Sequence, residues 1–154
     1  MISYRKANID DVNILAKIRS EFLMEVSNEY SEDKRVKSEI ANKLYLQKTL
    51  KDDSFVAWLA LDDDKIIATS GLSFYTVPPN HECLDGNVAY IMNIYTYPNY
   101  RNQGIGAELF KRVVEEARRR GYKKITLNAT NAGRPLYEKY GFRDVVGDMA
   151  FYVE

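Results

Sequence analysis

The sequence has too little cysteine and histidine for two common kinds of site. Cys83 is the single cysteine and His81 the single histidine. One cysteine cannot form an internal disulfide, and one of each cannot supply the ligands of a zinc site. No acid is placed to orient His81, so we expect no catalytic cysteine in this loop. We expect no metal ion either.

Positive charge is not in excess, and long apolar runs are missing. The 22 Lys and Arg residues balance 22 Asp and Glu residues, for a formal net charge of zero. A general nucleic-acid binder carries a basic surplus, and the run Arg118–Arg120 follows glutamates one turn earlier. No stretch reaches the roughly 18 apolar residues of a membrane span, and the start MISYRKANIDD lacks a signal-peptide core. We therefore expect a cytoplasmic protein that binds neither nucleic acid nor membrane.

What is present suits one globular domain. The chain has 154 residues, 45% of them apolar, so we predict a single domain over residues 1–154. Periodicity and turn signals predict strands at 2–6, 55–61, 65–75, 88–97 and 123–129, helices at 8–26, 31–50, 105–120 and 135–140, and one or two closing strands within 142–153. This order predicts an α/β fold, a mixed sheet of six to seven strands with about four helices on its faces.

The sharpest motif is Arg101-Asn102-Gln103-Gly104-Ile105-Gly106, between a predicted strand and an amphipathic helix. Gly104 and Gly106 let the backbone approach a ligand, and the first turn of the helix offers unpaired N–H groups to an anion such as pyrophosphate. A dinucleotide fingerprint needs a small residue where Leu109 stands, and a Walker loop needs a Gly-Lys-Ser/Thr sequence that is missing. On its own, the loop is equally typical of a tight turn.

Three segments together make the sequence resemble the GNAT N-acetyltransferase superfamily. They are NIYTYPNY at 93–100, the Arg101-x-x-Gly104-x-Gly106 loop, and LYEKYGF at 136–142. The resemblance implies that the strands at 90–97 and 123–129 splay apart at the centre of the sheet. Acetyl-CoA would bind there as co-substrate, and its acetyl group would pass directly to a primary amine.

The resemblance also implies which backbone groups hold the cofactor. The backbone of Ile94, Tyr95 and Thr96 would face pantetheine and the thioester. The amides that would hold the pyrophosphate are those of Arg101, Asn102, Gln103, Gly104, Ile105, Gly106 and Ala107. Many relatives carry a cofactor-contacting asparagine at the last strand–helix junction; here Thr130 stands in its place, and Gly133 stands where alanine is usual.

Tyr137 is the catalytic residue that the resemblance implies. A thiolate leaves in the reaction, and a phenol of pKa near 10 can protonate a thiol of pKa near 8.5. A backbone amide near Tyr95 would stabilise the oxyanion. The alternative is that Tyr137 only packs in an apolar cluster with Leu136, Tyr140 and Phe142.

The general base and the acceptor are less defined. Many relatives use a glutamate on the strand before the glycine loop, but this strand has no carboxylate. The base is either a water held by Asn93 or Tyr95, or an acid such as Glu25 or Glu29. These acids, with Glu21, would favour a cationic acceptor such as a polyamine, aminoglycoside or lysine, unless they are plain solvated charges. An amino-acid amine or a protein N-terminus is the other option.

Two expectations concern alternatives and partners. A non-catalytic, CoA-responsive binding or interaction module on the same fold is the alternative function, supported by the missing carboxylate. Many relatives form dimers through their C-terminal strands, so Tyr100, Phe151 and Tyr152 are candidates for a homodimer interface.

Overall fold

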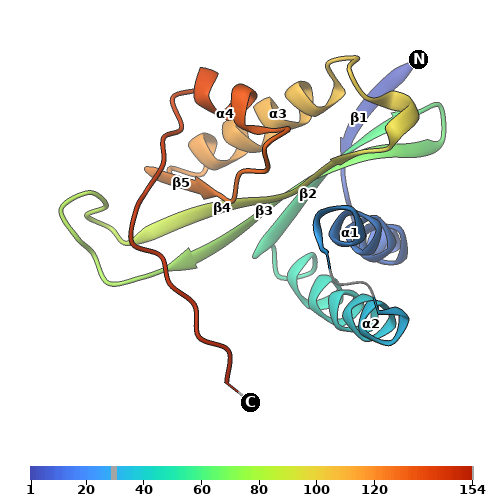
Figure 1. The fold of residues 1–154 in the computed structure, drawn as a ribbon. Coiled ribbons are helices and arrows are strands. Elements are labelled where there is room, and N and C mark those ends of the chain that lie inside the picture. Colours follow the sequence, from blue (N-terminus) through green and yellow to red (C-terminus); the bar gives the residue numbers. More distant parts are fainter. Residues whose placement is uncertain (29–30, 154) are drawn as a thin grey trace.

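The computed structural model describes residues 1–28 and 31–153, which form one mixed sheet with helices on both faces (Figure 1). The strands are β1 (Ile2–Lys6), β2 (Phe55–Asp62), β3 (Lys65–Thr76), β4 (Asn87–Thr96) and β5 (Lys124–Leu127). The helices are α1 (Val12–Val26), α2 (Glu32–Thr49), α3 (Ile105–Arg119) and α4 (Arg134–Lys139). The strand order is β1-β2-β3-β4-β5, antiparallel except for the parallel pair β4–β5.

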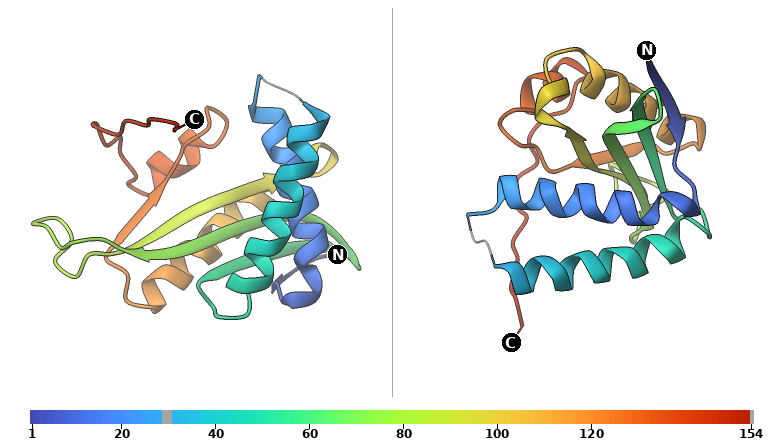
Figure 2. Two further views of the ribbon diagram at one scale, coloured as in Figure 1. Left: turned by 90° about the horizontal axis from the view of Figure 1, so that it is seen from below. Right: turned by 90° about the vertical axis from the view of Figure 1, so that its right-hand side faces the viewer.

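The helices cover the sheet in pairs. In the views of Figures 1 and 2, α1 and α2 lie on one face and α3 and α4 on the other. Leu15 of α1 and Leu46 of α2 share an apolar cluster with Leu59 of β2. Phe110 of α3 shares a second cluster with Ile91 of β4. Each strand at the centre is therefore covered on both faces.

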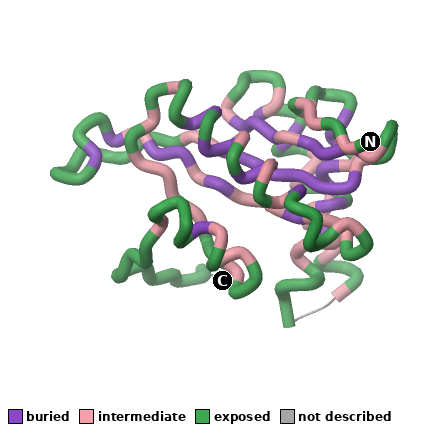
Figure 3. Tube along the Cα trace, turned by 90° about the horizontal axis from the view of Figure 1, so that it is seen from above, coloured by how far each residue is buried: buried purple, intermediate pink, exposed green. Residues whose placement is uncertain are grey.

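Burial follows this layering. The run FVAWLAL becomes β2, which is buried at nearly every position, and buried residues concentrate along the sheet in Figure 3. A strand covered on both faces needs apolar side chains at successive positions, which explains the continuous run. Among the described residues, no helix combines the length and the apolar character that crossing a membrane requires.

A β-bulge interrupts β4 at Asn93. Thr69 of β3 pairs with Tyr95 and Gly71 pairs with Met92, so two residues of β4 stand opposite one residue of β3. Asn93 has a φ of +57°, in the left-handed region that asparagine tolerates better than most residues. A bulge of this kind bends the strand locally and increases its twist.

The parallel pair β4–β5 is short. It ends at Ile91 and Leu127, whereas β4 continues to Thr96. The far half of β4 therefore has a backbone edge that β5 does not pair.

The prediction of six to seven strands is wrong, because the sheet has five strands in the part of the chain that the structure describes. The segment expected to close the sheet, residues 142–153, contains no strand and leads away from the sheet (Figure 1). From Arg143 onward its described side chains are exposed, Val146 by 98% and Met149 by 97%. A strand needs a neighbour to satisfy its backbone groups, and Gly147, at a φ of +118°, breaks the extended backbone within the segment.

Candidate active site

A cavity of about 460 Å³ lies in front of the glycine loop. It is bounded by the far half of β4, the loop, the first turn of α3 and the segment between β5 and α4. The predicted cofactor residues that line it are Ile94, Tyr95, Thr96, Arg101, Asn102, Gly104, Ile105, Gly106, Ala107 and Thr130, together with Tyr137. Gln103 is not among its lining residues, and its side chain donates to the carbonyl of Asn99 at 3.3 Å.

The start of α3 leaves backbone donors free. Gly104 is the N-cap, with a φ of +78° and no side-chain cap. The first amide of the helix with a backbone acceptor is that of Glu108, which donates to the carbonyl of Gly104 at 3.0 Å. A Cβ on Gly104 would meet no atom within 4 Å, and one on Gly106 would meet only the Thr96 hydroxyl, at 3.8 Å. Open space in front of unpaired N–H groups at a helix N-terminus suits an anion.

Arg101 folds back from the loop onto β4 and α1. Its Nε donates to the Thr96 carbonyl at 2.8 Å, and an Nη donates to Glu25 at 2.8 Å. Its guanidinium lies 5.4 Å from the centre of the Tyr95 ring. The Tyr95 hydroxyl also donates to Glu25, at 2.6 Å. These residues link the loop to α1.

This cluster changes the ionisation of its members. Burial acts to raise the pKa of Glu25, but hydrogen bonds from Tyr95 and Arg101 outweigh it and hold that pKa below the usual range. Burial and the Glu25 carboxylate raise the pKa of Tyr95 to about 12. Glu25 is a paired carboxylate and thus a weak proton acceptor.

The backbone N–H and C=O groups at the end of β4 point alternately toward β3 and toward the edge that β5 leaves open. Tyr97, just after β4, donates its N–H to the carbonyl of Ile67 in β3. Backbone groups of successive residues point to opposite sides of a strand, so those of Thr96 and Ile94 point to the edge that β5 leaves open. The hydrogen bond from Arg101 to the Thr96 carbonyl lies on this edge.

Tyr137 is buried, yet it reaches the cavity. Its ring packs against Phe110 and Phe142, with centroids 5.0 and 6.4 Å away. A Cβ on Gly133 would lie 2.5 Å from the Tyr137 hydroxyl, so glycine there makes room for the ring. Within the described residues that hydroxyl has no hydrogen-bond partner, and burial raises its pKa. The packing of Tyr137 in an apolar cluster is thus observed, and its catalytic role stays a prediction.

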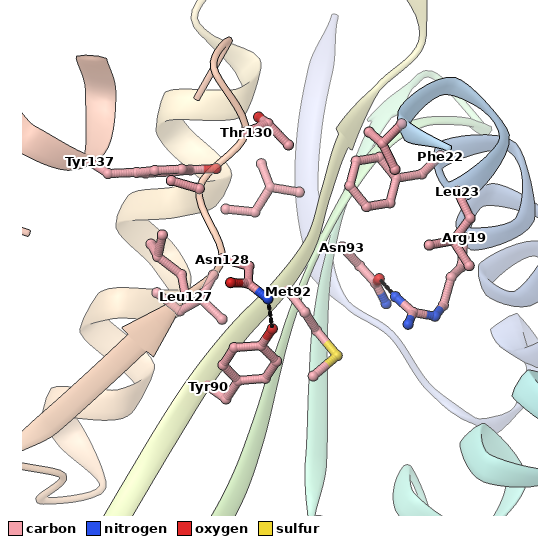
Figure 4. A pocket seen from close by; sticks show the side chains of 14 residues that line it. Arg19, Phe22, Leu23, Tyr90, Met92, Asn93, Leu127, Asn128, Thr130 and Tyr137 are labelled. Atoms are coloured by element: carbon pink, nitrogen blue, oxygen red, sulfur yellow. Dashed lines mark hydrogen bonds between the residues drawn. The ribbon is translucent and has the colours of Figure 1, made fainter. Parts of the chain in front are cut away.

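A second cavity, of about 330 Å³, adjoins the first (Figure 4). Its walls come from α1, from β4 around the bulge and from the segment after β5. It shares Phe22, Val26, Ile94, Thr130 and Tyr137 with the first cavity. One cavity can therefore hold the donor of a group and the other its acceptor, with Tyr137 at the boundary.

Arg19 and Asn93 face each other in this second cavity, which we call the acceptor cavity. An Nη of Arg19 donates to the Asn93 side-chain oxygen (Figure 4). Burial lowers the pKa of Arg19. Sequence reasoning missed Arg19, although it follows Leu15 by four residues and precedes Phe22 by three on the apolar face of α1. The signal available in the sequence was a charged residue among the apolar residues of a helix face that is expected to be buried.

Two of the acids expected to serve as base or to attract a cation, Glu21 and Glu25, do not line the acceptor cavity. Among the described residues, no carboxylate lines the acceptor cavity. Glu25 is paired with Arg101, and Glu21 lines a separate cavity beside Tyr97. Glu29 lies outside the described residues.

The remaining candidates are accounted for by local structure. The Thr130 hydroxyl accepts from the Gly133 amide at 3.3 Å, at the rim of both cavities. Cys83 is buried in its turn, with its Sγ 3.4 Å from Asp85. His81 is exposed in the same loop. The described residues hold no group of three or more His, Cys, Asp or Glu that suits a metal ion.

Comparison with known proteins agrees with this geometry. The model of the "Acetyltransferase (GNAT) family" matches residues 21–142. A predicted acetyltransferase from Clostridium acetobutylicum, solved with acetyl-CoA, is 34% identical with a TM-score of 0.90, over 99% of this chain and 96% of that chain. A GCN5-related N-acetyltransferase from Ralstonia eutropha JMP134 is 26% identical with a TM-score of 0.90, over 99% of each chain.

A curated relative gives a partial match. The chain is 36% identical over 56 residues to glucosamine 6-phosphate N-acetyltransferase of Trypanosoma brucei brucei, which is 36% of this chain and 38% of that protein. The length matched by the family model and the full-length likeness to the clostridial protein settle the class. This chain belongs to the acetyltransferase (GNAT) family, and the resemblance seen in its sequence is confirmed.

Proposed function

We propose that the protein transfers the acetyl group of acetyl-CoA to a primary amine. The observation that carries this proposal is the pair of adjoining cavities, with an anion-binding helix start at one end and Tyr137 and Ile94 at their boundary. The clostridial relative solved with acetyl-CoA supports the choice of donor.

The residues present fit this co-substrate. Acetyl-CoA supplies an acetyl thioester, a flexible pantetheine arm and a pyrophosphate. The amides from Asn102 to Ala107, which have no backbone acceptor among the described residues, suit the pyrophosphate, because open space lies in front of Gly104 and Gly106. The Arg101 amide, also predicted to hold it, instead donates to the carbonyl of Pro98 at 3.3 Å. The open backbone edge at Ile94 and Thr96 suits the amide groups of pantetheine, which can pair with it as a further strand would.

Two groups of the chain act on the reacting atoms. A backbone amide on the open edge, that of Ile94 or Thr96, donates to the carbonyl oxygen as negative charge develops on it. The Tyr137 hydroxyl donates its proton to the leaving sulfur. Burial raises its pKa, so it is protonated at neutral pH, and acetyl-CoA in the cavity would shield the hydroxyl from competing water.

The described residues of the acceptor cavity supply no carboxylate to take the proton of the acceptor ammonium. Glu25 is held as an ion pair, and the polar groups beside the boundary are the side chains of Asn93, Thr130 and Asn128. We infer that a water at these groups accepts the proton, which agrees with the expectation of a water held by Asn93.

The experiment that tests the proposal is calorimetric titration with acetyl-CoA. The native protein is compared with a Gly104→Glu/Gly106→Glu variant, whose carboxylates would extend into open space where the pyrophosphate is expected. We expect saturable binding by the native protein and none by the variant, with both folded by circular dichroism. No binding by folded native protein would refute the proposal.

The alternative function, a non-catalytic CoA-responsive module, makes a different prediction. Acetyl-CoA would bind, but no amine would be acetylated by the native protein in a panel that includes amino sugars, amino acids and polyamines. The Tyr137 hydroxyl at the cavity boundary favours the enzyme, since acetyl transfer requires a proton donor at the leaving sulfur and binding alone does not.

A further inference from the structure

Arg19 is the one charged side chain that lines the acceptor cavity among the described residues. It is half-buried, and its neighbours in the cavity wall are the apolar Phe22, Leu23 and Met92. Its one hydrogen-bond partner in the described part of the chain is the neutral side-chain oxygen of Asn93 (Figure 4). A guanidinium has five N–H donors, so most of those of Arg19 have no protein acceptor.

The other half-buried arginines are paired differently. Each has a carboxylate within ion-pair distance in the described structure, the pairs being Arg5–Asp11, Arg35–Glu39, Arg112–Glu108, Arg120–Glu116 and Arg134–Asp144. A charge withdrawn from water is unfavourable unless a charge of opposite sign compensates it. Arg19 therefore differs from the rest in that its anion is not supplied by the described chain.

The position of Arg19 relative to Tyr137 indicates which molecule carries the anion that Arg19 would bind. The two side chains lie on opposite sides of the same cavity (Figure 4), whose volume is about 330 Å³. A small molecule that places its amine at the Tyr137 boundary can reach Arg19 with another part of itself. We propose that the acceptor is a small amine that also carries a carboxylate or phosphate group, and that Arg19 binds this anion.

This proposal rests on the proposed function, and it narrows its substrate class. The planar guanidinium matches the paired oxygens of a carboxylate or phosphate, so it selects for such a group by geometry as well as by charge. The same charge disfavours acceptors that carry only positive groups, such as polyamines. The partial match to a glucosamine 6-phosphate N-acetyltransferase concerns an amine of the proposed kind.

The test is acceptor preference, measured as the ratio of kcat/KM within two matched pairs. One pair is glucosamine 6-phosphate and glucosamine, and the other is β-alanine and β-alaninamide. In at least one pair we expect the anionic member to be preferred by about tenfold or more, since hydrogen bonds between charged groups are the strong ones. A preference in the first pair identifies phosphate, and one in the second identifies carboxylate.

Substitutions at Arg19 show whether this residue is responsible. Arg19→Gln is expected to reduce the preference about tenfold, and Arg19→Lys to leave an intermediate preference because it keeps the charge without the planar fork. Arg118→Gln is the matched control, since Arg118 is exposed on α3 and lines neither cavity. Thermal melting confirms that each variant is folded.

The outcomes separate the two proposals. Equal kcat/KM within both pairs, or an Arg19→Gln variant that slows both members alike, would overturn the role of Arg19 while acetyl transfer stands. Failure of acetyl-CoA to bind would instead overturn the proposed function. In that case, calorimetric titration of glucosamine 6-phosphate and of β-alanine into native and Arg19→Gln protein still tests the anion site. Binding that does not depend on Arg19 would refute it.

Discussion

The two halves of the candidate site are built in different ways. The half proposed for the cofactor would use backbone groups from one continuous stretch, from β4 through the loop into α3. The half proposed for the acceptor would use side chains from α1, the bulge of β4 and the segment after β5. A site made of local backbone leaves a motif in the sequence, whereas a site made of side chains from distant segments does not. The cofactor half can therefore be conserved in form while the acceptor half varies.

Tyr137 belongs to both halves, so its removal should have the largest effect on turnover. We expect Tyr137→Phe to lower kcat by about 100-fold or more, as loss of a general acid does, with little change in acetyl-CoA affinity. Tyr140→Phe is the matched control, because Tyr140 directly follows the same short helix and contacts the same Phe110 ring. Undiminished turnover by the Tyr137 variant would leave Tyr137 as a packing residue only.

Gly133→Ala tests whether the position of Tyr137 matters as well as its chemistry. The new methyl group would lie 2.5 Å from the Tyr137 hydroxyl and 2.7 Å from its ring, so the ring must move. We expect kcat to fall about tenfold and stability to fall by about 1 kcal/mol or more, as overpacking usually costs. In a Tyr137→Phe background the same substitution should not lower kcat further. Additive losses in the double variant would contradict a shared mechanism.

Glu25→Gln tests the contact between α1 and the loop. Glu25 holds Arg101, and its negative charge stands beside the expected pyrophosphate site. Removing that charge should tighten acetyl-CoA binding about threefold at low salt, in keeping with the small energy of exposed ion pairs, and less at high salt. Titration calorimetry measures this, with Glu39→Gln on α2 as control. Weaker binding would mean that Glu25 positions Arg101 for the cofactor.

Removal of residues 145–154 should have the smallest effect. The described side chains of this tail are largely exposed, among them Val145 by 75% and Phe151 by 89%. We expect the free energy of unfolding to change by less than about 1 kcal/mol, the usual result for surface changes. Sedimentation of both forms measures self-association. A concentration-dependent loss of melting temperature on truncation would show that the tail contributes to a homodimer, which remains a prediction.

The sequence was informative where structure is local. The Arg101–Gly106 loop, the α3 pattern and the short helix that carries Tyr137 each depend on neighbouring residues, and the structure places them around one cavity. The pairing of Arg19 with Asn93 depends on a tertiary contact between α1 and β4. The apolar periodicity of this segment predicted only that one face of α1 packs in the core, and it gave no partner for Arg19.

The error over the C-terminal strands has a related cause. Alternating and apolar residues in 142–153 satisfy the local pattern of a strand, but a strand also requires a partner edge that no local pattern specifies. Propensity predicts the shape that a segment can adopt. Whether the segment forms a strand depends on a neighbouring strand with which its backbone can pair.

The bulge at Asn93 has a consequence for how β4 presents its two faces. Before it, the odd-numbered Ala89 and Ile91 pack with α3, and Met92 packs toward α1. After it, the even-numbered Ile94 packs toward α3, and Tyr95 meets Phe22 of α1. The extra residue therefore exchanges the faces of the sheet to which the odd-numbered and the even-numbered side chains of β4 point. Loss of a single residue here would turn each side chain after the bulge to the opposite face of the sheet, so that Tyr95 would point toward α3 and Ile94 toward α1.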